Sequence, residues 1–399
     1  MEQTRYRLQI TLMINIIVIT ISRLLLNTSR RFIYTFASTF SRALGVPLTS
    51  ITGLIAINQG TSLLGVVFGP LGDQVGYKLM ILLGMTCLTV GMLAAGILPF
   101  YGVLVAAMFL AGLGKTIVDQ AIQAYAGQRV PYHRRGLVIG MMELAWAGST
   151  LIGIPLMGLL IGKLGWQAPF LAIGLLSLFF VVIIVILFPK DQKQIKKGRQ
   201  LAETLEFWKQ ILVNRAAVGV LLFAFFVAIA NDAIFVVYGA WLEDSFHLSV
   251  IALGISTIVI GIAEVFGEAL TAFLADKIGL KKSTFLGLGA LPVSFILLPL
   301  ADKNLTVALA GLFFIFVSFE FTFVTAMSLS TELTPGSRAT LMSAFYAIAG
   351  VGHMTGAILG GIAWSMGKLT GTSILATGST ALAVLALIWG IWDWKRQLD

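Results

Sequence analysis

Long apolar runs separated by short polar segments fill almost the whole chain. A helix needs about 20 apolar residues to cross the ~30 Å hydrocarbon core of a bilayer, and twelve runs are long enough. They cover residues 9–40, 50–71, 79–98, 102–127, 136–162, 167–188, 216–242, 249–275, 283–301, 304–330, 340–366 and 370–392. Lipid-facing strands would alternate apolar and polar side chains, and these runs do not. The pattern predicts an all-α integral membrane protein with twelve transmembrane helices.

A polar turn between the second and third runs recurs half a chain later. Gly69-Pro-Leu-Gly-Asp-Gln-Val-Gly-Tyr-Lys78 is echoed by Ala272-Phe-Leu-Ala-Asp-Lys-Ile-Gly-Leu-Lys281. Three matching pairs are each 203 positions apart, namely Asp73 with Asp276, Gly76 with Gly279, and Lys78 with Lys281. A second landmark repeats at nearly the same spacing, with Pro131 and Arg134 matching Pro335 and Arg338. Two landmarks with one spacing indicate a duplicated chain.

The longest polar stretch divides the duplicated chain into halves. Residues 189–209 are rich in Lys, Gln and Glu and lie between the sixth and seventh runs. We therefore predict a six-helix bundle at 1–188, a linker at 189–215 and a second six-helix bundle at 216–399. Two pseudo-symmetric bundles related by a repeat are typical of transporters.

Composition and charge agree with a lipid environment. The chain is 58% hydrophobic and 11% charged, more apolar than a soluble protein of 399 residues can bury. With the N-terminus inside, 19 of the 27 Lys and Arg residues fall on the cytoplasmic side and four on the external side. The positive-inside rule therefore predicts an inner-membrane protein with both termini in the cytoplasm. The net charge of +9 is then a topology signal, not a nucleic-acid site. The first run is too long for a cleavable signal peptide, and none is expected.

The polar turn carries a family resemblance. It resembles the signature between helices two and three of the major facilitator superfamily, keeping Gly69, Asp73, Gly76 and Lys78 but having Gln74 where Arg is usual. The resemblance implies the two-bundle fold of that superfamily. It also implies a cytoplasmic gate, to which we assign Gly69, Asp73, Gly76, Lys78, Arg134, Asp276, Gly279, Lys281 and Arg338. A carboxylate in such a gate is stabilised by a helix N-terminus.

The fifth run carries a second motif. Gly148, Gly153, Pro155 and Gly158 are similar to the Gly/Pro motif of drug:proton antiporter and sugar-efflux-like branches of the superfamily. Small residues let two helices approach closely, and proline bends a helix. Plain helix packing explains the motif equally well.

Ionisable residues inside the predicted spans are the strongest functional signal. Each costs about 2.5–3.5 kcal/mol to insert, so it should face a partner or a watery cavity. We assign the substrate and proton pathway to Arg23, Arg30, Arg31, Lys115, Asp119, Asp232, Glu264, Glu320 and His353. Glu143 and Glu268 also lie within spans; the first is expected to serve helix packing or a charged network, and the second the gate. All four cations belong to the first half, and most of the acids to the second.

Specific pairings follow from spacing. Arg30 and Asp232 occupy nearly equivalent positions in helices one and seven, 202 apart, which predicts an ion pair between the halves. Lys115 and Asp119 are one turn apart and can pair locally, while Asp119 can also bind Arg23.

Proton carriage is assigned to buried acids. A low-dielectric surrounding favours the neutral form of a carboxyl group, so Glu264, Glu320 and Asp232 are candidates for proton coupling. His353 is the group in the spans matched to neutral pH.

Other chemistry is not expected. Gly112-Leu-Gly-Lys-Thr116 resembles the end of a phosphate-binding loop, but the first glycine is replaced by Phe109 and the segment lies in an apolar helix. The three histidines are scattered, which argues against a metal site. We expect no enzyme activity, cofactor, metal or nucleic acid. The expected partners are a small-molecule substrate, protons and membrane lipids, and a monomer is the expected form.

Three functions remain open at this stage. The first is secondary active transport by alternating access, as proton-coupled export of a small amphiphilic compound. The second is transport of an anionic or lipid-like solute held by Arg30, Arg31 and Lys115. The third is a membrane receptor that binds a ligand without transport. Fold alone does not decide among them.

Overall fold

The computed structural model describes residues 2–65, 68, 71, 75–129, 142–188, 213–333 and 338–394, without the side chains of residues 2–12, 123–124, 126–129, 276 and 338–340. All regular elements in these ranges are helical. The predicted linker, residues 189–215, lies almost entirely outside the described residues.

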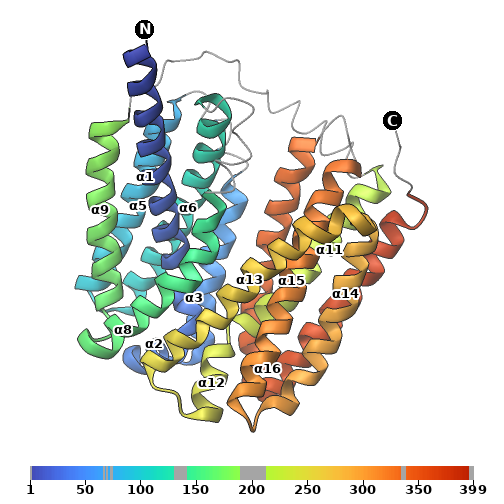
Figure 1. The fold of residues 1–399 in the computed structure, drawn as a ribbon. Helices are drawn as coiled ribbons and strands as arrows, with labels where there is room; N and C mark the ends of the chain where they lie inside the picture. The colour runs from blue at the N-terminus through green and yellow to red at the C-terminus, as the bar shows by residue number, and fades with distance from the viewer. Residues whose placement is uncertain are drawn as a thin grey trace.

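The helices form two groups (Figure 1). The first group contains α1 (Glu2–Thr35), α2 (Ala37–Leu44), α3 (Leu48–Gly60), η1 (Thr61–Leu64), α5 (Tyr77–Ile97), α6 (Tyr101–Arg129), η2 (Ser149–Gly153), α8 (Ile154–Leu164) and α9 (Ala168–Leu187). The second group contains α11 (Arg215–Phe235), α12 (Tyr238–Phe246), α13 (Val250–Ile278), α14 (Leu280–Leu297), η3 (Leu298–Ala301), α15 (Leu305–Leu333) and α16 (Arg338–Ile391).

Twelve membrane-crossing segments follow from these elements. Nine described segments are long and apolar enough to cross a bilayer. The last of them, Leu341–Ile391, is two helices, because the backbone leaves helical geometry at Gly367 and Lys368. Nine segments with one of them double give ten helices, and α1 and α3 bring the number to twelve. The predicted all-α membrane fold is confirmed.

Two of the predicted helices are broken near one end. The first run is divided at Phe36 into α1 and α2, and the seventh at Val236 and Val237 into α11 and α12. The two breaks face one another, and the side-chain oxygens of Thr35 and Tyr238 are 2.5 Å apart. The sequence pattern did not predict these breaks, because the apolar runs continue through them.

The two groups meet at one end of the molecule. α1 begins and α16 ends at the same end, at the top of Figure 1, which we call the terminal end; the opposite end, with the connections at residues 45–47 and 165–167, is the distal end. α3 packs along α16, and α8 packs against α13. Both contacts lie toward the distal end, since they involve the beginnings of α3 and α13. The groups are joined there.

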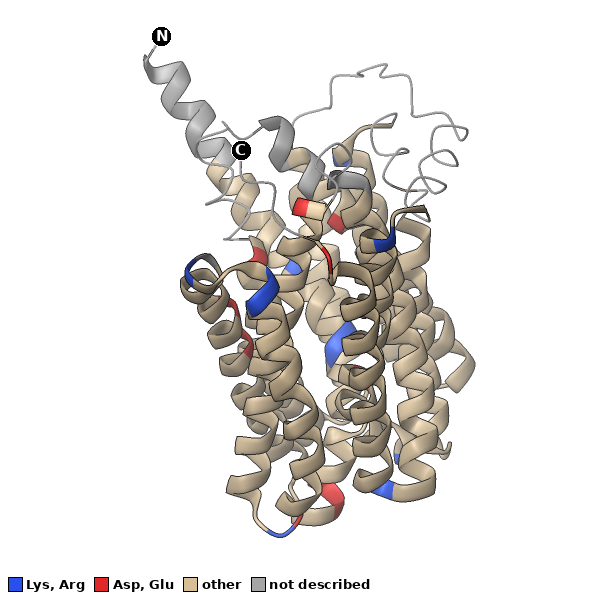
Figure 2. Ribbon diagram, turned by 90° about the vertical axis from the view of Figure 1, so that its right-hand side faces the viewer, with Lys and Arg blue, Asp and Glu red and all other residues tan. Residues whose placement is uncertain are grey.

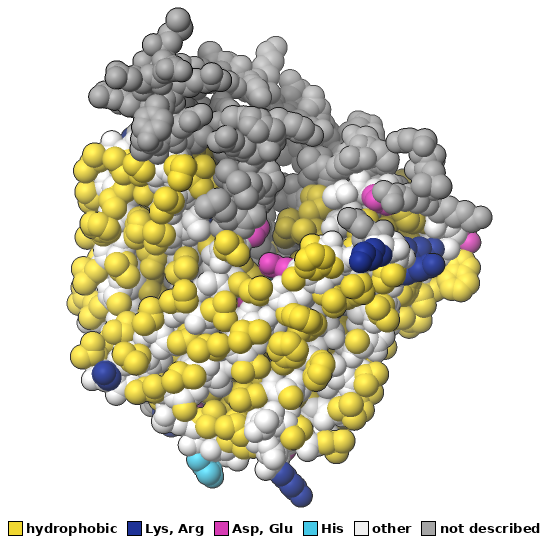
Figure 3. All heavy atoms as spheres, viewed as in Figure 1, with side chains coloured by type: hydrophobic (Ala, Val, Ile, Leu, Met, Phe, Trp, Pro, Cys, Tyr) yellow, Lys and Arg dark blue, Asp and Glu magenta, His cyan; other side chains and the backbone are white. Residues whose placement is uncertain are grey.

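Side-chain character matches a bilayer. Charged residues gather at the two ends of the ribbon, with few at mid-height (Figure 2). The side face of the molecule is mostly apolar (Figure 3). Large apolar side chains that are exposed in the structure include Phe179, Val182 and Phe273. A wide apolar surface of this kind is stable only against lipid or a partner protein. Helices satisfy their own backbone hydrogen bonds in that environment.

Candidate functional site

One face of α1 carries most of the polar side chains of the site. Arg23, Asn27, Arg30 and Tyr34 are spaced by four, three and four residues, which places them on one stripe of a helix. Arg23, Asn27 and Tyr34 are buried and Arg30 is half-buried. The stripe therefore faces the interior of the molecule rather than lipid.

A charge cluster within the first group connects this stripe to α6. The Lys115 ammonium donates to Asn27 Oδ1 and Asp119 Oδ2, each at 2.7 Å. Arg23 reaches the other Asp119 oxygen at 3.2 Å and Glu143 Oε1 at 2.8 Å. Asp119 therefore binds both Lys115 and Arg23, as the spacing allowed. Glu143, expected to serve packing or a charged network, is part of this cluster.

An ion pair joins the two groups at the centre of the molecule. Both terminal nitrogens of Arg31 bind the two carboxylate oxygens of Glu264 on α13, and the side chains are only 3% and 1% exposed. Thr150 donates to Glu264 Oε2 at 2.9 Å. The Trp146 ring lies 4.3 Å from the Arg31 guanidinium carbon. Such a bidentate arrangement, in which both terminal nitrogens of the guanidinium are bonded and the Nε alone has no partner, helps to keep both charges stable when buried.

Glu320 of α15 lies beside this pair. It is buried, and it interacts electrostatically with Glu264 and Arg31. Gly267 of α13 lies directly against it, and a Cβ there would be 2.7 Å from the Glu320 Cβ. Arg31 thus contacts one carboxylate and has a second close by.

A second hydrogen-bonded chain crosses between the groups. Gln59 of α3 donates to the Tyr34 hydroxyl, which donates to Asp232 Oδ2 at 3.2 Å. The other Asp232 oxygen is 2.9 Å from His353 Nδ1 and accepts from Asn231 at 3.2 Å. Four helices, α1, α3, α11 and α16, therefore contribute to one network centred on Asp232.

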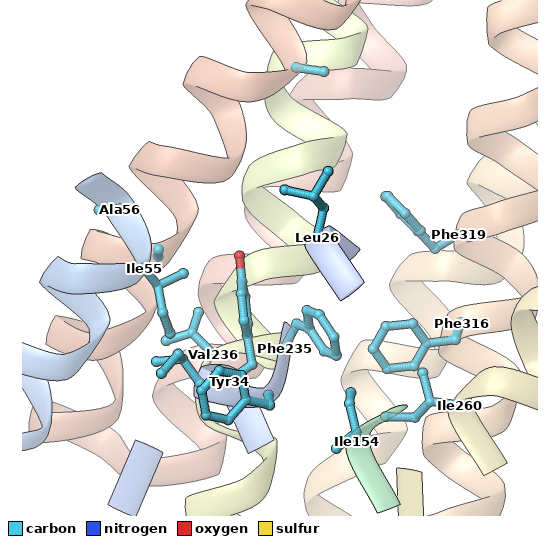
Figure 4. Close-up of a cluster of buried hydrophobic side chains, with 14 of the residues drawn as sticks. Leu26, Tyr34, Ile55, Ala56, Ile154, Phe235, Val236, Ile260, Phe316 and Phe319 are labelled. Atoms are coloured by element: carbon cyan, nitrogen blue, oxygen red, sulfur yellow. The ribbon is translucent and has the colours of Figure 1, made fainter. Parts of the chain in front are cut away.

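Aromatic side chains surround the lower part of this network. Figure 4 shows Tyr34 next to Phe235, with Phe316 beyond it. The ring centroids of Tyr34 and Phe235 are 4.6 Å apart, and those of Phe235 and Phe316 are 5.3 Å apart. Apolar walls of this kind strengthen the electrostatic contacts that they enclose.

The predicted ion pair between Arg30 and Asp232 is absent from this conformation. Asp232 is occupied by Tyr34, His353 and Asn231, and Arg30 forms no ion pair with any residue that the structure describes. Tyr34, which stands one turn further on the same stripe, reaches Asp232 instead. A pair of Arg30 and Asp232 that forms when the two halves rock stays a prediction.

Several residues of the site were not singled out from the sequence. Tyr34 donates to Asp232 and Thr150 to Glu264, each across the two groups, and the Trp146 carbonyl accepts from Arg31 within the first group. Gln59 reaches Asp232 only through the Tyr34 hydroxyl. Gln59 could have been found as a polar side chain within an apolar run. Tyr34 could have been found from its place one turn after Arg30.

The gate motif is described only in part. Gly69, Asp73 and Arg134 lie outside the described residues, as do the side chains of Asp276 and Arg338. The backbones of Gly76 and Gly279 have positive φ values of 97° and 87°, immediately before α5 and α14. Only glycine adopts this geometry without strain, so the two turns have the same structural requirement.

The two lysines of that motif contact helix ends. Lys78 donates to the carbonyls of Val185 (2.9 Å) and Phe188 (2.5 Å), at the end of α9. Lys281 donates to the carbonyls of Ile391 (2.7 Å) and Trp392 (3.1 Å), at the end of α16. A cation at a helix C-terminus satisfies free carbonyls and complements the helix dipole. Each lysine therefore ties two helices of its own group together; a role in gating remains a prediction.

The Gly/Pro motif brings two helices close to their neighbours. Gly148 and Gly153 lie against Leu24 and Thr28 of α1. Around Ser149–Gly153 the helix widens into a π-helical turn, which precedes Pro155 and accommodates its missing N–H.

Further along the same motif, Gly158 faces the other group. A Cβ at Gly158 would be 3.1 Å from the Gly254 Cα of α13. This is part of the distal contact between the groups.

The distal and terminal ends differ in exposure. At the distal end Glu243 of α12 binds Arg42 at 2.5 Å and accepts from Ser38, so the groups are closed there. Toward the terminal end, side chains that face the seam remain open to solvent. Glu143 is 43% and Asp119 26% exposed. Figure 3 shows acidic side chains between the two groups on this side.

The described residues contain no group of three or more His, Cys, Asp or Glu side chains that could hold a metal ion. The chemistry available in the site is therefore that of ion pairs, hydrogen bonds and proton-binding carboxylates. These are suited to binding and releasing small polar groups within a membrane.

Comparison with known proteins identifies the fold. The model of the Major Facilitator Superfamily matches residues 19–231 and 220–397. The MFS-type transporter YceJ of Bacillus subtilis (strain 168) is 25% identical over 325 residues, which cover 81% of each chain. The class C tetracycline resistance protein of Escherichia coli is 24% identical over 245 residues, 60% of each chain. A solved structure of the nucleoside transporter NupG has a TM-score of 0.79 at 13% identity, and the match covers 95% of this chain and 99% of that one. The chain belongs to the Major Facilitator Superfamily and is a multi-pass membrane transporter of that type.

Proposed function

We propose that the chain exports a small amphiphilic compound in exchange for protons by alternating access. It resides in the cell's inner membrane with both termini in the cytoplasm. Residues 1–188 and 216–399 move as two bundles joined by the linker at 189–215. The terminal end then opens to the cytoplasm and the distal end to the outside.

The observation that carries this proposal is the pair of buried polar contacts between the groups. Arg31 of the first group binds Glu264 of the second, and Tyr34 of the first group binds Asp232 of the second, which His353 of its own group also contacts. When the two bundles rock, these contacts must be broken and remade. A carboxylate that loses its cation in a low-dielectric setting takes up a proton, which couples protonation to reorientation.

The closed distal end and the exposed terminal end support alternating access. Ion pairs and close glycine contacts join the groups distally, whereas Glu143 and Asp119 meet solvent on the terminal side. The positive-inside distribution assigns the terminal side to the cytoplasm. The conformation is then the one that admits a substrate from the cytoplasm.

The proposed direction of transport and the proposed substrate class rest on resemblance to other transporters. The Gly/Pro motif from Gly148 to Gly158 is similar to that of drug:proton antiporters, and one relative is named as a tetracycline resistance protein. A mixed lining of charged groups and aromatic rings suits a compound with one polar end.

The proposal is tested in proteoliposomes with an imposed pH gradient. Intravesicular pH is followed while matched cationic and anionic amphiphiles are added to wild type, Asp232→Asn and Lys163→Gln. Lys163 lies exposed at the distal end of α8, so its variant controls for charge loss alone. We expect proton flux with at least one amphiphile in wild type and Lys163→Gln, and none in Asp232→Asn. Movement of labelled compound without proton flux would instead describe a facilitator.

A further inference from the structure

Arg30 differs from every other cation of the central site. Its guanidinium forms no ion pair within the described part of the chain, whereas Arg23, Arg31 and Lys115 each do. Its Nε, like that of Arg31, is buried without a hydrogen-bond partner. The residue is half-buried, so part of the side chain meets open space. An unpaired guanidinium inside a membrane protein is costly unless water or a ligand compensates its charge.

The neighbouring cations are already paired with acidic side chains of the protein. Lys115 and Arg23 share Asp119, and Arg31 is held by Glu264. Of the three cations first considered for an anionic solute, Arg31 and Lys115 are therefore neutralised within the protein. Only Arg30 is left to receive an anion.

Polar groups with unpartnered atoms lie on the same stripe of α1 as Arg30, or in the network around Tyr34 and Asp232 that begins one turn further along α1. Asn27, three residues earlier on α1, has an unpartnered Nδ2, because its Oδ1 accepts from Lys115. Gln59 has an unpartnered Oε1, because its Nε2 donates to Tyr34. Asn231 likewise has an unpartnered Oδ1 beside Asp232. Buried polar groups normally find partners, so unpartnered atoms that are held in place indicate a missing one.

We propose that Arg30 binds the head group of the transported compound, and that this head group is a carboxylate. This inference rests on the proposed transport function. The planar guanidinium matches a carboxylate in two parallel hydrogen bonds. A single cation balances a single negative charge, which favours a carboxylate over a doubly charged phosphate. Asn27 adds one donor through Nδ2.

The test measures equilibrium binding to the full-length protein in detergent. The probes are radiolabelled 1-naphthoate, benzoate and octanoate, set against 1-naphthylmethylammonium and octylammonium. Wild type is compared with Arg30→Gln, Arg30→Lys and the distal control Lys163→Gln. Melting temperatures of all variants in the same detergent establish that each is folded.

We expect saturable binding of at least one carboxylate to wild type and to Lys163→Gln. In Arg30→Gln the dissociation constant should rise about 10- to 100-fold, as expected for losing a charge-assisted bidentate contact. Arg30→Lys keeps the positive charge but lacks the planar guanidinium, so its dissociation constant should lie between those of wild type and Arg30→Gln. Affinity for the ammonium probes should not fall in Arg30→Gln.

Three outcomes would overturn the inference. One is the absence of saturable carboxylate binding to wild type, and another is an Arg30→Gln affinity within twofold of wild type. The third is a loss of turnover in Arg30→Gln with unchanged carboxylate affinity, which would make Arg30 a partner for Asp232 during reorientation. The transport proposal is judged separately. Export of an ammonium probe alone would support proton-coupled export and reject a carboxylate head group. Carboxylate binding through Arg30 without any flux would support the carboxylate head group and reject transport.

Discussion

Arg31 on α1 and Glu264 on α13 form a buried bidentate ion pair that joins the two groups of helices. Each charge also has a second contact, Arg31 with the Trp146 carbonyl at 3.4 Å and Glu264 with Thr150. The pair lies just above the closed distal contact between α8 and α13. Any motion that separates α1 from α13 must therefore leave both charges without their present partners.

Removing one charge of this pair should be far more harmful than removing both. Glu264→Gln leaves the buried Arg31 without the carboxylate that it hydrogen-bonds and with Glu320 as its nearby anion, at a cost toward the lower end of about 3–5 kcal/mol of unfolding free energy. Arg31→Met with Glu264→Met should cost clearly less than the sum of the single variants. Unfolding in mixed micelles measures these values.

The exposed pair of Arg42 and Glu243 offers a matched control between the same groups. Removing that pair should cost less than about 1 kcal/mol, because solvent screens it. Equal costs for the two pairs would show that the Arg31 pair is not effectively buried.

Gly158 should be needed for closure of the distal end. A Cβ there would meet Gly254, Phe36 and the Val250 carbonyl at 3.1 Å. Gly158→Val should therefore wedge α8 from α13, at a cost of about 1–3 kcal/mol, and reduce transport. Maleimide labelling of Ser38→Cys, in a background with Cys87→Ser, should become several-fold faster.

Gly289 provides the control for this substitution. It is an exposed helical glycine of α14, and a Cβ added to it would have no atom within 4 Å. Gly289→Val should leave labelling and transport unchanged. If the two variants behaved alike, helix propensity rather than the contact with Gly254 would explain the effect.

Much of the fold could be predicted from the sequence because lipid imposes a simple rule. Each crossing needs a long apolar run, so α5 and α9 were predicted to within two residues of their observed ends. The breaks at Phe36 and Val236 could not be predicted this way. They depend on contacts between α1 and α11, which no local pattern records.

The site was predictable in its residue types but not in its pairings. The charged residues of the site could be recognised because an ionisable side chain inside an apolar run is costly to insert into a membrane. The pair of Lys115 and Asp119 followed from helical spacing. The partner of Arg31 could not be inferred, since Glu264 lies 233 residues away. Arg30 and Asp232 occupy nearly equivalent positions in the first and seventh runs, but only the structure reveals that Tyr34, and not Arg30, contacts Asp232.

Lys78 and Lys281 should contribute similar stability to their two groups. Each satisfies carbonyls at the end of the last helix of its group, α9 for Lys78 and α16 for Lys281. Lys78→Met and Lys281→Met should each cost about 1 kcal/mol. Hydrogen exchange should quicken at the end of α9 in the first variant and at the end of α16 in the second. Exchange that quickened at both ends in either variant would contradict separate local caps.

Tyr34 should link the state of Asp232 to the first group of helices. Tyr34→Phe keeps the ring against Phe235 but removes the hydroxyl that accepts from Gln59 and donates to Asp232. Two buried polar groups then lose a partner, at a cost of about 1–3 kcal/mol in unfolding free energy. The variant also removes the contact of Asp232 with the first group. If Asp232 carries the coupled proton, proton flux in proteoliposomes should therefore fall, while the affinity for substrate should change little.

Tyr238→Phe is the matched comparison, because its hydroxyl contacts Thr35 on the other side of the same junction and not Asp232. It should lower stability by a smaller amount, since it removes one buried hydrogen bond where Tyr34→Phe removes two. Proton flux per transported molecule should nevertheless stay at the wild-type level. A fall in that ratio in both variants would mean that general loosening of the junction between α1 and α11, rather than the bond from Tyr34 to Asp232, controls the coupling.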